Sequence, residues 1–124
     1  MIYAYSLVVP ANTPSLSPVT HELRLARGII SRVEIEFPPG CAGLVMARVL
    51  YRERQIYPTN PEGYFRADGY TISFDDDRLI NSTPYHVKLV AWSEDDTFPH
   101  TISFRFLVVH EVSVPSWLRR LIRM

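Results

Sequence analysis

Histidine and carboxylate side chains are the groups in this sequence that could bind a metal ion or move protons. None of the four histidines has the His-x-x-x-His or His-x-His spacing of a metal site: His21, His86, His100 and His110. We expect them to be surface residues on separate strands. Two acidic runs, residues 75–77 and 94–96, lack the spaced, glycine-containing order of a calcium loop and are expected to be solvated turns. The sequence therefore predicts no metal site.

The nucleophilic side chains also lack a catalytic context. No serine stands in the Gly-x-Ser-x-Gly turn of a hydrolase, and the five glycines form no phosphate-binding pattern. Cys41 is the only cysteine, which excludes an internal disulfide. Its turn, residues 38–43, could expose a reactive thiol, but we favour a small buried hydrophobic side chain. Paired carboxylates of the glycosidase kind stay open until the geometry is known. We expect a protein that is not an enzyme and needs no cofactor.

Aromatic side chains give a stronger signal, at 12% of the chain. A possible ligand surface surrounds the loop that follows residue 57, and its members are Tyr57, Asn60, Tyr64, Phe65 and Tyr70. Exposed tyrosines are typical of antibody paratopes and of sugar-binding faces. The alternative, which we favour, is that these rings cover the mouth of a small hydrophobic core.

The C-terminal residues 115–124 form the second candidate contact segment. A helix capped by Ser116, or with Pro115 in its first turn, would place four apolar side chains on one face and three arginines on the other. These residues are Trp117, Leu118, Leu121 and Ile122, and Arg119, Arg120 and Arg123. So short a helix is marginal in water. We therefore expect it to dock on a neighbouring subunit or another protein, with a membrane surface as the weaker alternative.

Apolar and polar residues alternate along most of the chain, which predicts β-strands. These strands must hold the candidate segments in place. In residues 29–37, for example, Val33, Ile35 and Phe37 alternate with charged residues. Strands are expected at residues 2–9, 21–26, 29–37, 43–51, 55–57, 70–74, 84–92 and 100–109. Residues 93–99 have the length of a hairpin loop that would pair the last two strands. About eight such strands indicate an all-β fold, a single antiparallel β-sandwich or jelly roll.

The predicted core follows from the same alternation. The residues expected to be buried are Val33, Ile35, Val45, Val49, Leu89, Ala91, Phe104 and Phe106. Residues 1–114 should form the sandwich domain, including a Pro-rich connector at 10–18, and residues 115–124 the separate docking segment.

Composition limits the possible partners. The chain has 124 residues, enough for one domain with a real core. Thirteen basic and thirteen acidic residues cancel, so no overall field attracts nucleic acid. Ten prolines leave little room for long helices. We see no signal peptide and no membrane-spanning stretch, and expect synthesis in the cytoplasm.

Three stretches of the chain, residues 28–45, 55–63 and 91–102, resemble small proteins encoded among the structural genes of tailed phages and prophages. The resemblance implies a β-sandwich virion component, such as a head decoration or accessory protein. It also implies location in the virion, a homo-oligomer, and the major capsid protein or another virion protein as partner. It assigns no functional residue.

Two hypotheses therefore stand. In the first, the chain is a virion assembly protein that binds a protein lattice. In the second, it is a carbohydrate- or receptor-binding module that uses the aromatic loop surface.

Overall fold

A computed structural model describes residues 1–110 of the chain as eight β-strands, with no helix in that range. The strands are β1 (Ile2–Val9), β2 (Val19–Arg24), β3 (Gly28–Phe37), β4 (Val45–Tyr51), β5 (Arg54–Tyr57), β6 (Tyr70–Ile80), β7 (His86–Ser93) and β8 (His100–Val109). Every expected strand is present: the first and last have the expected bounds, and the other six differ at one or both ends. No helix among the described residues could cross a membrane. The predicted C-terminal helix and its docking residues 117–123 lie outside the described residues.

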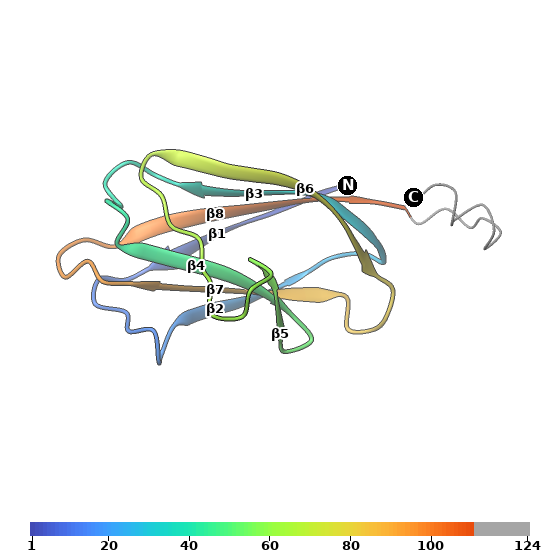
Figure 1. The fold of residues 1–124 in the computed structure, drawn as a ribbon, viewed down its shortest axis with the longest axis horizontal. Coiled ribbons are helices and arrows are strands. Elements are labelled where there is room, and N and C mark those ends of the chain that lie inside the picture. The colour runs from blue at the N-terminus through green and yellow to red at the C-terminus, as the bar shows by residue number, and fades with distance from the viewer. Residues whose placement is uncertain (111–124) are drawn as a thin grey trace.

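The strands form two antiparallel four-stranded sheets, ordered β1-β8-β3-β6 and β2-β7-β4-β5. Pairing is symmetric in chain order: β1 pairs with β8, β2 with β7, β3 with β6, and β4 with β5. This is the pattern of one long hairpin rolled into two layers, which is the jelly-roll topology. Figure 1 shows the two layers, with β3 and β8 in one and β4 and β7 in the other. The predicted all-β sandwich is confirmed.

The core lies between the two sheets and draws residues from both. The eight residues predicted to be buried all have 0% exposure: Val33, Ile35, Val45, Val49, Leu89, Ala91, Phe104 and Phe106. β4 also packs on its outer face, where Met46 forms a second, smaller cluster with Val90 and Trp92. Alternation thus identified the inward faces correctly.

The predicted hairpin between the last two strands is wrong. β7 and β8 belong to different sheets, so residues 94–99 cross from one layer to the other. The layers of a sandwich lie about 10 Å apart, a gap that a loop of this length spans easily. A hairpin and a crossover can have the same loop length and the same strand patterns, so the local sequence does not separate them.

The predicted solvated turn at residues 75–77 is also wrong, because β6 continues through it to Ile80. β6 is an edge strand of its sheet. Asp75 is exposed and pairs with Arg32 at 3.0 Å between Oδ1 and Nη1, whereas Asp76 is half-buried and accepts a hydrogen bond from Tyr57. Asp75 thus has a partner on the neighbouring strand β3, and Asp76 has one on β5 of the other sheet.

Loops at one end of the sandwich are tied together by backbone hydrogen bonds. Asn12 N–H donates to the Asp95 carbonyl at 2.8 Å, and Glu94 N–H donates to the Leu44 carbonyl at 2.8 Å. Gly69 N–H donates to the Pro38 carbonyl at 3.3 Å. The connector, the β3–β4 turn, the segment before β6 and the β7–β8 crossover therefore form one ordered end of the molecule.

Candidate functional site

The predicted aromatic surface is only partly a surface. Tyr57 is 5% exposed, so its ring contributes little to that surface. Its hydroxyl donates a 2.6 Å hydrogen bond to Asp76 Oδ2. Burial first, and this bond second, raise the pKa of Tyr57 well above its usual range. The buried, hydrogen-bonded Tyr57 side chain therefore contributes to the stability of the fold.

Other members of the set are divided between the core and the solvent. Phe65 is half-buried and packs on Phe74 with ring centroids 5.8 Å apart, while Phe74 also meets Tyr57 edge-on at 5.1 Å. These rings cover one side of the core, as the favoured interpretation held. Tyr64 and Tyr70 are exposed, at 44% and 64%. Asn60 is exposed as well, and its backbone carbonyl accepts hydrogen bonds from the Gln55 side chain on β5 and from Gly63 N–H in the same loop.

A buried His–Asp pair stands where a surface histidine was expected. The side chains of His100 and Asp95 are 8% and 11% exposed, and His100 Nε2 lies 2.7 Å from Asp95 Oδ2. Asp95 Oδ1 also accepts the backbone N–H groups of Thr97 and Phe98. The His100 bond, followed by the Thr97 bond, lowers the pKa of Asp95 below its usual range. This pair fastens the β7–β8 crossover.

Cys41 is fully buried, as expected. Desolvation, reinforced by the charges of Asp68 and Asp95, raises the pKa of its thiol. The nucleophilic form of cysteine is the thiolate. With 0% exposure and a place in the core cluster, Cys41 acts as a packing residue. Among residues 1–110, no three potential ligands gather into a group that could hold a metal.

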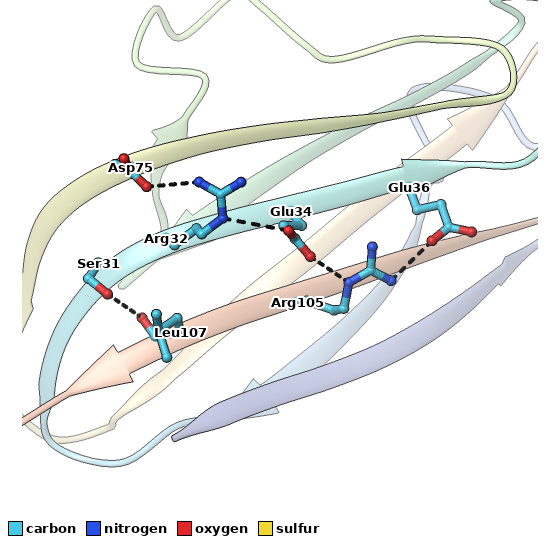
Figure 2. A network of polar contacts seen from close by, with 7 residues as sticks. All are labelled: Ser31, Arg32, Glu34, Glu36, Asp75, Arg105 and Leu107. Carbon is cyan, nitrogen blue, oxygen red and sulfur yellow. Dashed lines mark hydrogen bonds and ion pairs between the residues drawn. The ribbon is translucent and has the colours of Figure 1, made fainter.

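A ladder of ion pairs crosses the outer face of the β1-β8-β3-β6 sheet (Figure 2). Arg105 Nε on β8 lies 2.9 Å from Glu34 Oε1 on β3, and its Nη1 lies 3.1 Å from Glu36 Oε1. Arg32 continues the ladder from Glu34 to Asp75 on β6. The Arg105 hydrogen bond is the main cause that lowers the pKa of Glu34. The ladder therefore pairs five charged side chains of this face with one another: Arg32, Glu34, Glu36, Asp75 and Arg105.

An open recess of about 300 Å³ is lined by Glu22, Arg52, Glu53, Pro84, His86 and Lys88. Two contacts between oppositely charged side-chain types lie in its wall. Lys88 Nζ lies 3.2 Å from Glu53 Oε1, and His86 Nε2 lies 3.6 Å from Glu22 Oε2. Both acidic side chains of the recess, Glu22 and Glu53, are therefore already engaged by a neighbouring side chain.

The free edge of β1 is the candidate contact site. Met1 and Val108 exchange two backbone hydrogen bonds, of 2.8 and 2.7 Å, and β1 pairs with β8 in unbroken register from there. In an antiparallel pair, hydrogen-bonded and non-hydrogen-bonded positions alternate. The odd-numbered residues of β1 therefore bond to β8, and the even-numbered residues direct their N–H and C=O groups away from it. The even-numbered residues are Ile2, Ala4, Ser6 and Val8, and all are exposed.

No described backbone hydrogen bond outside the sheet ladders engages these four residues in residues 1–110. Their side chains lie on the outer face, where Ile2 is 72% and Val8 is 57% exposed. We call this surface, Ile2, Ala4, Ser6 and Val8, the β1 edge. It combines backbone donors and acceptors that residues 1–110 leave unpaired with exposed apolar side chains, and that combination is what an added strand requires.

The other three edge strands are protected in recognisable ways. β6 carries the three aspartates and pairs with β3 across a bulge near Ile30 and Arg32. β2 carries Glu22 and Arg24, and β5 has only four residues. Charge, bulges and shortness are the usual means by which proteins block edge-to-edge pairing. β1 has eight residues, no charge and no bulge.

Comparisons with known proteins add little. No family model matches the chain, and no curated protein matches it. It is similar to a solved structure from work on Bacillus endospore appendages, which are described as a novel family of disulfide-linked pili. That structure is 12% identical over 88% of each chain, with a TM-score of 0.38. So low a TM-score does not establish a shared fold, and it has no bearing on function.

Proposed function

We propose that this protein is a non-enzymatic assembly subunit that joins a neighbouring protein by adding a strand at the β1 edge. The observation that supports this most is the contrast between β1 and the three protected edge strands. An uncharged eight-residue edge with free backbone groups is a liability in a protein that stays alone. In an assembly, the same edge supplies main-chain hydrogen bonds for affinity and exposed side chains for specificity.

The rigidity of the fold suits such a role. The inward residues of β1, including Leu7 and Val9, are buried, and β1 is held along its whole length by β8. An edge fixed in this way loses little conformational freedom when a partner strand binds. Preorganisation of this kind favours affinity at a given contact area.

The particular assembly that we propose is a tailed-phage virion, where the chain would act as a decoration or accessory protein. This part of the proposal rests on the sequence resemblance of residues 28–45, 55–63 and 91–102. It predicts that the chain copurifies with intact particles at a fixed ratio to the major capsid protein. Particles that contain no copies of the chain would contradict it.

The assembly role is tested with a proline at the centre of the β1 edge. Ala4→Pro removes an N–H that does not bond to β8, and proline is tolerated in an edge strand at such a position. Its ring would block an incoming strand. Ala4→Ser is the matched control, because it alters the same side chain and keeps the N–H. Both variants are produced in the native source as full chains, and complexes are separated by size under native conditions.

The proposal predicts that the wild-type and Ala4→Ser chains migrate in complexes larger than the monomer. The Ala4→Pro chain should migrate as a folded monomer with an unchanged circular dichroism spectrum. Equal amounts of complex for all three chains would contradict the role of the β1 edge.

A further inference from the structure

We infer that the strand received by the β1 edge is β1 of a second copy of this chain, running antiparallel, with Ile2 opposite Val8 of the second copy. This inference rests on the proposed function and names its partner. The β1 edge is self-complementary in three respects: hydrogen bonding, side-chain pairing and charge.

The hydrogen bonds of the β1 edge fit a second copy of itself. Antiparallel pairing of Ile2 with Val8 also pairs Ala4 with Ser6, and each of these pairs occurs twice about a two-fold axis. All four residues of the edge then occupy hydrogen-bonded positions, since these residues direct their backbone groups outward. The axis passes beside Tyr5, whose ring is fixed by stacking on His21 at 3.6 Å between centroids.

Side chains select this register over its neighbours. Hydrogen-bonding geometry allows shifts of two residues, which pair Ile2 with Ser6 or Ala4 with Val8. Each shift leaves one of the two most exposed apolar side chains of the edge without a partner, and these are Ile2 at 72% and Val8 at 57%. In the proposed register both are covered, and apolar pairs directly opposite one another stabilise a sheet.

Charge and symmetry favour a second copy over the other edges of the fold. β1 has no charged side chain, so two copies bring no like charges together. Pairing with β6 would instead place the β1 edge against a strand with three aspartates and an arginine. A two-fold interface uses one surface twice and closes the assembly as a dimer. Its β1-β8-β3-β6 sheets would merge into one continuous sheet of eight strands.

Cysteine cross-linking of the purified full chain tests the partner and the register together. In the double variant Ile2→Cys/Val8→Cys, the paired Cα atoms would lie about 5.5 Å apart, within the range that a disulfide bridges. In either single variant the two new cysteines would lie six residues apart, about 20 Å, and could not react. Wild-type protein controls for Cys41, which is fully buried.

The inference predicts a covalent dimer for the double variant on mild oxidation, and none for wild type or either single variant. Under reducing conditions, Ala4→Pro in the double-cysteine background should raise the dimer dissociation constant by about tenfold or more, because each copy loses a hydrogen bond. A covalent dimer of Ile2→Cys alone would overturn the antiparallel register. Absence of cross-linking in the double variant would overturn the second copy as partner.

These results are separable from the test of the proposed function. If the double variant does not cross-link but Ala4→Pro still removes the chain from native complexes, the inference fails and the assembly role stands. If Ala4→Pro leaves the native complexes intact, both fail.

Discussion

Replacing Phe104 by alanine removes one of the largest fully buried side chains from the centre of the sandwich. Phe104 is 0% exposed and lies on β8, which has β1 on one side and β3 on the other. Its cross-strand neighbours are Tyr5 and Ile35. A residue enclosed by a strand on each side and by the facing sheet has little room to relax after truncation.

The expected cost follows from two contributions. Burying a phenylalanine side chain stabilises a fold by about 1.5–3 kcal/mol through removal of apolar surface from water. The cavity that remains adds to this, so Phe→Ala at a core site costs about 3–5 kcal/mol. Domains of this size have unfolding free energies of about 5–15 kcal/mol, so the loss is a large share of the total.

Urea denaturation measures this loss directly. With a slope of about 1–3 kcal/mol per molar urea, a loss of about 3–5 kcal/mol should lower the midpoint by roughly 1–5 M. Leu107→Ala is the matched control, because Leu107 lies on the same strand but is half-buried on the outer face. It should cost about 1 kcal/mol or less. A loss below about 1 kcal/mol for Phe104→Ala, or equal losses for the two variants, would refute the assignment of the inner face of β8.

Three further predictions concern side chains that the fold buries or pairs. Tyr57→Phe should lower the free energy of unfolding by about 1–2 kcal/mol in urea melts, because it removes the hydrogen bond that the Tyr57 hydroxyl donates to the Asp76 carboxylate. Tyr70→Phe, at an exposed site, is the control and should leave the free energy of unfolding unchanged. Equal effects of the two substitutions would contradict the pairing. The fold lowers the pKa of Asp95, so its contribution to stability is present above about pH 4 and is lost as the pH falls through the folded value. The urea midpoint should therefore fall less between pH 7 and pH 2 for Asp95→Asn than for wild type. An identical fall for the two proteins would contradict this. The Cys41 thiol should resist a thiol reagent at pH 8 in the folded protein and react fully in urea, whereas rapid labelling of the folded chain would show that it is not buried.

The strands and the core could be predicted from the sequence because alternation with a period of two is a local signal. Val33, Ile35, Phe104 and Phe106 reveal their faces through their immediate neighbours alone. Sheet membership is not local. The crossover at residues 94–99 has a hairpin's length, and only the position of β7 in the second sheet distinguishes the two.

The paired polar groups were missed for the same reason. Asp76 belongs to a strand because Tyr57, nineteen residues earlier, supplies a donor to it. His100 is buried because Asp95 accepts its hydrogen bond across the crossover. The signal for the β1 edge was present, since residues 2–9 contain no charge, but its meaning depends on the topology that makes β1 an edge strand.

Amide hydrogen exchange along β1, followed by NMR as the protein concentration is raised, tests the central claim most directly. The odd-numbered amides bond to β8 and should be protected at every concentration. The amides of Ala4, Ser6 and Val8 should exchange rapidly in the dilute monomer and become protected as the chain associates. If these three amides still exchange at the rate of the monomer in the associated protein, the β1 edge is not the contact and the account is wrong.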